Sequence, residues 1–170
     1  MNIILQSERL LFREFTIEDA PLIYQLNSDP EVLKYVHELP PANIEAAQLN
    51  ITGGILPQYI KHGYGRWGVF VKENNKFIGW CGLKYREERK EVDLGYRFIR
   101  SAWGQGYATE AAAATLSHGF RICGLPEIAA MAHVENLASL RVLEKIGMRF
   151  KGFDMVDSCP VKTYTLERAE

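Results

Sequence analysis

Two glycines at the start of an alanine-rich segment are the residues with the clearest chemical meaning in this sequence. Gly104 and Gly106 follow a strand-like run that ends at Ile99 and precede a helix-like run that begins at Ala108. The first turn of a helix leaves N–H groups without internal partners, and the helix dipole adds partial positive charge there. Because glycine also permits close backbone approach, the pattern favours binding of an anion such as phosphate. The alternative is a tight turn that needs glycine for its geometry alone.

Two common phosphate-binding patterns are excluded at this loop. The Walker A pattern fails because no Gly-Lys-Ser/Thr follows the glycines, and the dinucleotide fingerprint fails because no third glycine closes it. The interpretations left are a short loop suited to hold a pyrophosphate mainly through backbone N–H groups, and a tight turn that binds nothing.

Asn136 and Ser139 form a second candidate site. They follow the strand-like run 128–134 and lie at the start of the helix-like run 137–146. Asn is among the best N-cap residues, so one interpretation is a cap with Ser139 as an ordinary first-turn residue. In the other interpretation this helix start lies at the C-terminal end of a strand parallel to the strand before the glycine loop. Ligands of mixed sheets bind at such places.

Groups for proton transfer are expected on the neighbouring strands. Asp93 and Glu91 are two residues apart and therefore share one face of their strand. They are candidates for a general base, or for ion pairs with Arg97 or Arg86 on a solvated face. His133, near the end of its strand, has a pKa range suited to proton transfer, with a structural role as the alternative.

Composition bounds the class of protein. The chain has 170 residues, a net charge of −1 and 47% hydrophobic residues, as expected for one globular domain, 1–170. This charge gives no reason to expect nucleic-acid or membrane partners. No apolar run approaches the ~20 residues of a membrane span, and the N-terminus has no signal-peptide pattern. The three cysteines fit neither a disulfide framework nor a metal site, so we expect reduced thiols, no metal and a cytoplasmic location.

Hydrophobic periodicity predicts a mixed α/β fold. The strand-like runs are 8–15, 65–72, 77–85, 91–99, 128–134, 149–155 and 161–166. The helix-like runs are 17–26, the short 31–35, the interrupted 43–59, 108–123 and 137–146. Three strands within 65–99 form an antiparallel meander, and the next strand–helix–strand unit must be parallel and right-handed. An exposed edge is expected near Val161–Leu166, where strand pairing offers a homodimer contact.

Several ordered motifs give the chain a resemblance to the GNAT superfamily of N-acetyltransferases. Trp103–Ala108 resembles the superfamily's coenzyme A signature, Arg/Gln-x-x-Gly-x-Gly/Ala, with Gly106 and Ala108 at its two small positions. Trp103 departs from the usual Arg or Gln, and this departure is typical of the RimJ/RimL-type ribosomal-protein alanine N-acetyltransferases. The resemblance to that branch covers almost the whole chain through the motifs Ser7–Leu10, Glu18–Ala20, Phe77–Leu83, Asp93–Tyr96 and Asn136–Met148.

The resemblance implies a GNAT-like acyl-CoA N-acyltransferase fold and an enzyme that uses acetyl-CoA as cosubstrate. It implies that Asn136 hydrogen-bonds the coenzyme arm and that Ser139 is the acid for the departing thiolate. Many members use a Tyr at the place of Leu143. Asp93 matches the family's acidic position and is the predicted base, with Glu91 or a water relay as the alternatives. The residues predicted to bind the coenzyme are Phe98, Ile99, Trp103, Gly104, Gln105, Gly106, Tyr107, Ala108, Thr109 and Asn136.

The implied reaction is direct transfer of an acetyl group to a primary amine. Backbone N–H groups from Arg97 to Ile99 are candidates for stabilising the developing oxyanion. No covalent enzyme intermediate is required, so Cys81 and Cys123 are expected in the core. The branch resemblance points to a protein N-terminal α-amine as acceptor. The alternatives are a small-molecule amine (a polyamine, amino acid or aminoglycoside) and a coenzyme A-binding module without turnover. By analogy with the family, segment 35–65 covers the acceptor side.

Overall fold

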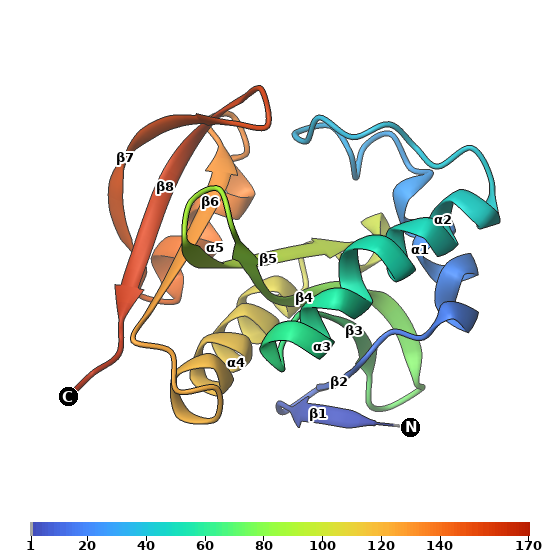
Figure 1. Cartoon of the computed structure of the whole chain (residues 1–170), viewed down its shortest axis with the longest axis horizontal. Coiled ribbons are helices and arrows are strands. Elements are labelled where there is room, and N and C mark those ends of the chain that lie inside the picture. Colours follow the sequence, from blue (N-terminus) through green and yellow to red (C-terminus); the bar gives the residue numbers. More distant parts are fainter. Residues whose placement is uncertain (1) are drawn as a thin grey trace.

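One eight-stranded sheet forms the centre of the structure, a computed structural model that describes residues 2–170 (Figure 1). The strand order is β1-β2-β3-β4-β5-β6-β8-β7. The strands are β1 (Ile3–Gln6), β2 (Leu10–Arg13), β3 (Arg66–Val71), β4 (Lys76–Arg86), β5 (Glu91–Phe98), β6 (Glu127–His133), β7 (Arg149–Val156) and β8 (Cys159–Glu167). Every neighbouring pair is antiparallel except β5 and β6, which confirms the predicted mixed sheet and its β3–β4–β5 meander.

Five α-helices connect these strands. They are α1 (Ala20–Asn27), α2 (Ile44–Asn50), α3 (Leu56–His62), α4 (Tyr107–Arg121) and α5 (Leu137–Lys145). A π-helical segment, Ile51–Ile55, joins α2 to α3. It contains Gly53 and Gly54, two poor helix formers, so the predicted interruption of the 43–59 run is confirmed. Within residues 2–170, no helix is long and apolar enough to cross a membrane.

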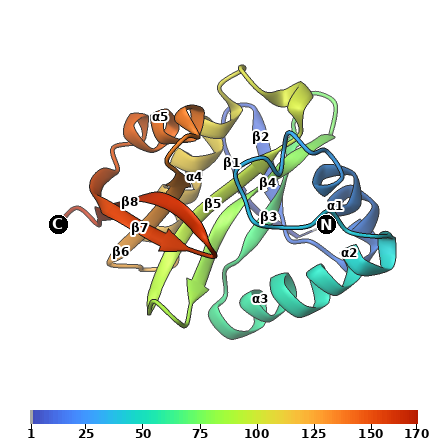
Figure 2. The same cartoon turned by 90° about the horizontal axis from the view of Figure 1, so that it is seen from above.

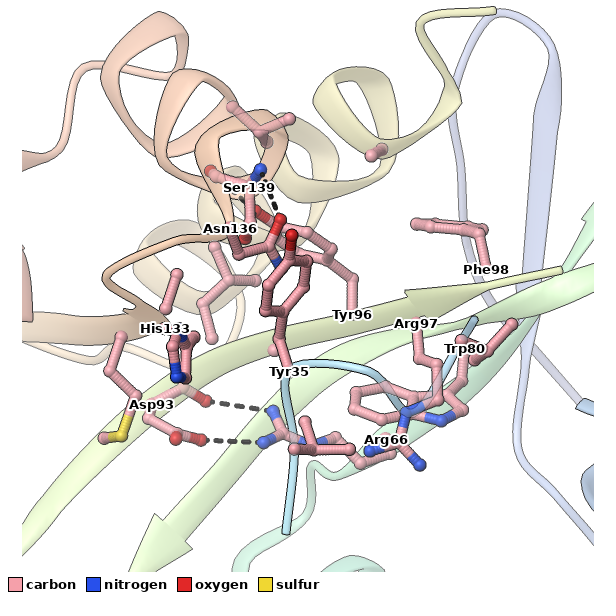
Figure 3. A pocket seen from close by; sticks show the side chains of 18 of the residues that line it. Tyr35, Arg66, Trp80, Asp93, Tyr96, Arg97, Phe98, His133, Asn136 and Ser139 are labelled. Carbon is pink, nitrogen blue, oxygen red and sulfur yellow. Dashed lines mark hydrogen bonds and ion pairs between the residues drawn. The ribbon is translucent and has the colours of Figure 1, made fainter. Parts of the chain in front are cut away.

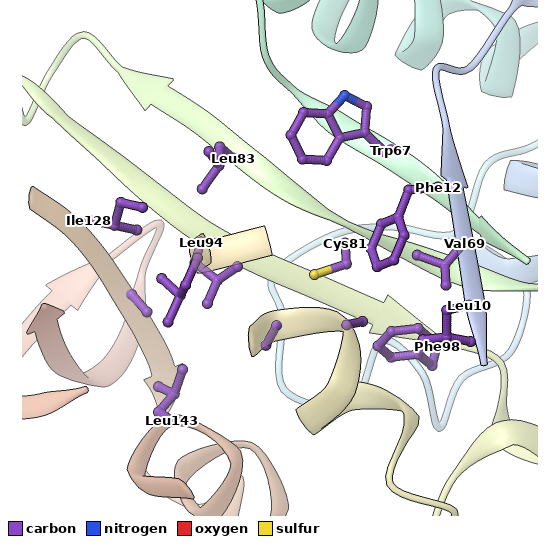
Figure 4. Close-up of a cluster of buried hydrophobic side chains, with 14 of the residues drawn as sticks. Leu10, Phe12, Trp67, Val69, Cys81, Leu83, Leu94, Phe98, Ile128 and Leu143 are labelled. Atoms are coloured by element: carbon purple, nitrogen blue, oxygen red, sulfur yellow. The ribbon is translucent and has the colours of Figure 1, made fainter. Parts of the chain in front are cut away.

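The helices lie on both faces of the sheet (Figure 2). α4 and α5 cover one face, where the larger hydrophobic cluster lies (Figure 4). α1 and α2 cover the other face with a smaller cluster that includes Phe70 of β3. Val69, its neighbour in β3, belongs to the larger cluster, because successive strand residues point to opposite faces. The larger cluster is built from residues such as Leu10, Phe12, Trp67, Val69, Cys81, Leu83, Leu94, Phe98, Leu116, Ile128 and Leu143.

The parallel pair β5 and β6 opens the sheet. These strands pair over only two positions, Asp93 with Ala129 and Leu94 with Ala130. Beyond them β5 continues to Phe98 and β6 continues to the end of the strand without pairing with each other. The strands therefore part at their C-terminal ends. α4 follows β5 and α5 follows β6, so both helices begin at this opening.

The structure corrects three expectations. The run Val161–Leu166 is no exposed edge, because β8 is hydrogen-bonded to β6 on one side and to β7 on the other. β7 is the edge strand instead, so the predicted dimer contact has no free edge on β8. The run 31–35 forms turns rather than a helix, since its few backbone bonds do not propagate into a second turn. β1 was not predicted.

Candidate active site

The glycine loop enters α4 through two left-handed residues. Gly104 has a φ of 74° and Gly106 a φ of 81°. Side chains other than glycine's adopt this region at a cost of about 1–2 kcal/mol. A Cβ on Gly104 would meet no atom within 4 Å, so the loop faces open space there. Glycine is thus needed for the turn, and the same turn leaves the backbone accessible to a ligand.

Six consecutive backbone N–H groups, from Gly104 to Thr109, are free at this loop. None of them donates a hydrogen bond to another group in the described part of the chain. The first bond of the helix runs from Glu110 N to the Gly106 carbonyl at 3.1 Å. The dipole of the 15-residue α4 adds positive charge at the same place. This geometry is an anion cradle, and it favours the anion site over the turn alone.

The N-terminal segment braces the cradle. Glu110 accepts hydrogen bonds from Arg9 N and Arg9 Nε, both at 2.7 Å. Arg9 also donates to the Gln105 carbonyl at 2.9 Å, and its Nη2 lies 3.4 Å from where a Cβ on Gly106 would be. A guanidinium group therefore stands at the rim of the cradle. Sequence reasoning missed this role, because Arg9 and Glu110 are 101 positions apart; the Ser7–Leu10 motif was the available signal.

A cleft of about 1310 Å³ leads from the cradle along the opening between β5 and β6 (Figure 3). Asp93 and Ser139, the predicted base and acid, both line it. Ile99 and Gln105 do not: Ile99 N donates to the Ile78 carbonyl at 2.8 Å, and Gln105 Nε2 folds back onto the Ser101 carbonyl at 2.9 Å. The other predicted coenzyme-binding residues all line the cleft: Phe98, Trp103, Gly104, Gly106, Tyr107, Ala108, Thr109 and Asn136.

Trp103 fastens the loop to the end of β5. Its indole Nε1 donates to the Phe98 carbonyl at 2.9 Å, while the ring remains 46% exposed. Trp103 thus takes part in shaping the loop.

Asn136 caps α5. Its side-chain oxygen accepts a hydrogen bond from Ser139 N at 3.2 Å, which confirms the capping interpretation (Figure 3). The side-chain NH₂ group of Asn136 makes no hydrogen bond within residues 2–170, and the residue lines the cleft. The cap and a contact with a ligand are therefore compatible, since they use different atoms of one amide.

Ser139 is paired with Tyr96, the last residue of the Asp93–Tyr96 motif. The two hydroxyl oxygens lie 2.9 Å apart, and Tyr96 Oη also lies 3.2 Å from the Ser139 carbonyl (Figure 3). Burial raises the pKa of Tyr96, so its hydroxyl keeps its proton at neutral pH. When Tyr96 donates its one proton to Ser139 Oγ rather than to the Ser139 carbonyl, the Ser139 proton is free to point into the cleft.

The backbone of β5 offers N–H donors at the opening. Ile99 N donates to the carbonyl of Ile78 in β4, so this N–H group does not face the opening. Because N–H directions alternate along a strand, Arg97 N also points to β4, whereas Tyr96 N and Phe98 N point to the β6 side. Of the backbone N–H groups predicted at Arg97 to Ile99, only that of Phe98 therefore faces the cleft. The N–H group of Tyr96, which was not predicted, faces it as well.

Asp93 is buried between two arginines. Its carboxylate lies 2.9 Å from Arg66 Nη2 and 2.7 Å from Arg86 Nε, and its side chain is 3% exposed. Burial would raise the pKa of Asp93, but the two guanidinium groups outweigh it and hold the pKa below the usual range. This argues against the predicted base. Of the alternative, the ion pair with Arg86 is confirmed, but the solvated face is wrong, because Asp93 is buried. We therefore regard Asp93 as a positioning residue that holds Arg66 across the sheet.

Replacing Asp93 with asparagine is expected to lower the free energy of unfolding by about 3 kcal/mol, because two buried arginines lose their counter-charge. The folded-state pKa of Asp93 is lowered, so its contribution is present above about pH 4 and is lost as the pH falls through the folded-state pKa. Urea unfolding between pH 3 and pH 7 measures the difference. Glu91→Gln is the matched control, because Glu91 pairs with Arg89 near the surface and should cost less than about 1 kcal/mol. A small, pH-independent effect of Asp93→Asn would contradict this account.

The remaining reactive side chains have structural surroundings. Cys81 is fully buried 3.2 Å from Thr115 Oγ1, and burial raises the pKa of its thiol to about 12. Cys81 thus lies in the core, as expected. The His133 ring lies 5.4 Å from the Tyr35 ring, and its Nδ1 accepts a hydrogen bond from Glu135 N at 3.1 Å. These contacts favour the structural interpretation of His133.

A mixed sheet that parts between two parallel strands, with an anion cradle at the adjoining helix, is the arrangement expected from the resemblance to the GNAT acyltransferase fold. Residues 9–149 match the family model described as an acetyltransferase (GNAT) domain. The chain therefore belongs to the GNAT family, and it is an N-acetyltransferase. The uncharacterized N-acetyltransferase p20 of Bacillus licheniformis is 32% identical over 149 residues, which cover 87% of this chain and 83% of that relative.

Solved structures share the fold over nearly the whole chain. A GNAT-family acetyltransferase from Bacillus anthracis superposes with a TM-score of 0.80 at 28% identity, covering 97% of this chain and 98% of its own. RimL, a ribosomal-protein α-N-acetyltransferase solved in complex with coenzyme A, has a TM-score of 0.83 at 20% identity, covering 98% of both chains. At that identity the second similarity shows the fold alone.

Proposed function

We propose that this N-acetyltransferase takes the acetyl group from acetyl-CoA and transfers it to the α-amine at the N-terminus of a protein. The observation that carries the proposal is the continuity of the cleft, from the free N–H groups of 104–109 past Asn136 and Ser139 to the acceptor side. Its volume of about 1310 Å³ exceeds the ~300–1,000 Å³ of typical small-molecule sites, so a chain end fits beside the coenzyme.

The residues fit a coenzyme A thioester. The N–H groups of 104–109 suit a pyrophosphate, with the Arg9 guanidinium at the rim, and a side chain on Gly106 would fill that space. The free amide NH₂ of Asn136 suits a carbonyl of the coenzyme arm. When bound, acetyl-CoA supplies an activated acetyl carbonyl and a thiolate leaving group.

In this proposal the chain's own groups act on two atoms of the thioester, the carbonyl oxygen and the sulfur. Tyr96 N and Phe98 N face the opening and stabilise negative charge on the carbonyl oxygen. Ser139 Oγ donates its proton toward the departing sulfur, and Tyr96 orients that hydroxyl at 2.9 Å. Asp93 is held in its ion pairs, so in this proposal water in the open cleft takes the proton of the amine and returns a proton to Ser139 Oγ.

The acceptor side is bounded by the irregular segment 28–43, here called the strap, which joins α1 to α2 (Figure 1). The strap contacts the cleft through Tyr35 on His133 and through Glu38, which lies 2.9 Å from Arg97. These two contacts narrow the acceptor end of the cleft. A narrow acceptor end favours the second candidate acceptor, a small-molecule amine. The RimL neighbour, named for a ribosomal-protein α-N-acetyltransferase, supports the first. A cytoplasmic location is part of the proposal and agrees with three free cysteines.

An acceptor screen tests the proposal. Peptides with Ala, Ser or Met at the N-terminus are compared with polyamines, amino acids and aminoglycosides by thiol release from acetyl-CoA. We expect the peptides to give the highest kcat/KM, and the same peptides with a blocked N-terminus to release no thiol. Turnover of small amines alone would establish the second candidate. Tight acetyl-CoA binding without thiol release from any amine would instead indicate a binding module without turnover.

A further inference from the structure

Three cations gather on the acceptor face of the sheet. Arg66 of β3 and Arg97 of β5 flank the Trp80 ring, with their guanidinium carbons 5.0 and 5.4 Å from its centroid (Figure 3). Lys84 lies on the same face of β4 as Trp80, because strand residues four apart point the same way. All three line the cleft.

Glycines make room for this arrangement. Gly82 and Gly95 lie opposite each other in the β4–β5 ladder. A Cβ on Gly95 would come within 2.7 Å of the Arg66 guanidinium, and a Cβ on Gly82 would strike the Gly65 carbonyl at 2.0 Å. The Gly95 position therefore lets Arg66 lie flat across the sheet, where it reaches both Asp93 and the acceptor side of the cleft.

One carboxylate from the strap already occupies this cluster. Glu38 Oε2 and Oε1 lie 2.9 and 3.1 Å from Arg97 Nη1 and Nη2, a two-point contact. Partial burial would raise the pKa of Glu38, but Arg97, and at longer range Lys84 and Arg66, hold it below its usual range. Glu38 belongs to a segment without helix or strand, and its side chain is 54% exposed. The carboxylate is therefore held by this contact rather than by a rigid element.

One cation of this cluster is left without an ion pair. Asp93 is shared by Arg66 and Arg86, and Glu38 is taken up by Arg97. Arg86 also lies 3.5 Å from Glu88 and from Asp157. Lys84 forms no ion pair and no side-chain hydrogen bond within residues 2–170. Lys84 is half-buried in the cleft wall, and its charge acts on Glu38. An unpaired cation near an exchangeable carboxylate is suited to bind a second anion.

We propose that Arg97 and Lys84 form a subsite for a carboxylate of the acceptor, and that Glu38 holds this place until the acceptor displaces it. This rests on the proposed function and narrows its substrate class to amines that carry a carboxylate close to the amino group. Such groups occur at protein N-termini followed by Asp or Glu, and in free amino acids. Displacement of Glu38 removes one of the contacts that hold the strap over the cleft.

Matched peptides test the subsite. Ala-Glu-Glu-Gly and Ala-Gln-Gln-Gly, both amidated at the C-terminus, are compared as acceptors, and free alanine is compared with alaninamide. We expect kcat/KM to be about tenfold higher for the member of each pair that carries the carboxylate, as for one charge-assisted hydrogen bond. Lys84→Met should remove most of this preference, and Glu38→Gln should raise kcat/KM for the acidic acceptors. Lys76→Met, at the exposed start of β4, is the control and should leave the preference unchanged.

The outcomes separate the two proposals. Equal kcat/KM within both pairs, or a preference that survives Lys84→Met in a variant with the wild-type melting temperature, would overturn the subsite. In that case acetylation of the peptides would still uphold the protein N-terminus as acceptor. Turnover of alanine without turnover of either peptide would overturn the protein acceptor, and the preference for alanine over alaninamide would then decide the subsite alone.

Discussion

Replacing Gly106 with glutamate is expected to weaken acetyl-CoA binding by at least about 100-fold, because a like charge placed against the phosphates costs several kcal/mol. Gly106 is the N-cap of α4 with a φ of 81°, and the free N–H groups lie on either side of it. The new side chain would extend into the cradle and bring a carboxylate to the site of the pyrophosphate. Titration calorimetry with acetyl-CoA, without an acceptor, measures the dissociation constant directly.

The matched control is Gly124→Glu. Gly124 also has a positive φ, 67°, with no atom within 4 Å of an added Cβ, but it lies beyond the C-terminal end of α4. Both variants carry the same backbone strain of about 1–2 kcal/mol and the same added charge. Only Gly106→Glu should lose the coenzyme. If the two variants bind acetyl-CoA equally well, the cradle is not the phosphate site.

Elements whose signals lie within a few neighbouring residues were predictable from the sequence. The break at Gly53–Gly54, the meander and the helix entry at Gly106 follow from local propensity and backbone geometry. The place of β8 was not predictable, because it depends on which of several antiparallel partners a strand selects. The edge strand β7 carries Phe150 and Phe153, which are 51% and 72% exposed, so its apolar composition resembles that of an interior strand.

The same distinction between local and long-range contacts applies to the candidate site. The glycine loop and the Asn136 cap were predictable because each is made by residues within a few positions of one another. The contacts of Arg66 with Asp93 and of Tyr96 with Ser139 join residues 27 and 43 positions apart on different elements. No periodicity encodes such pairs. Gly95 carried an indirect signal, since a strand glycine marks close approach of another group, here the Arg66 guanidinium.

Replacing Ser139 with alanine is expected to lower kcat on the order of 100-fold, the typical contribution of a positioned proton donor. The thiolate would then leave without the Ser139 proton. The dissociation constant for acetyl-CoA should change little, because the cradle lies on α4 and Ser139 lies on α5. Single-turnover kinetics with a saturating acceptor measure the chemical step, and calorimetry measures the binding. Ser117→Ala, at an exposed position of α4, is the control and should retain the wild-type kcat.

Tyr96→Phe tests whether the two hydroxyls act as one unit. Removing the Tyr96 hydroxyl leaves Ser139 in place but without the partner at 2.9 Å, so kcat should fall by about tenfold without loss of acetyl-CoA affinity. Residues that act together are not additive, so the Tyr96→Phe/Ser139→Ala double variant should be no slower than Ser139→Ala alone. A purely structural role for Tyr96 would instead give multiplicative losses. A Ser139→Ala enzyme with the wild-type kcat would exclude Ser139 as the acid, and the leaving thiolate would then depend on the dipole of α5.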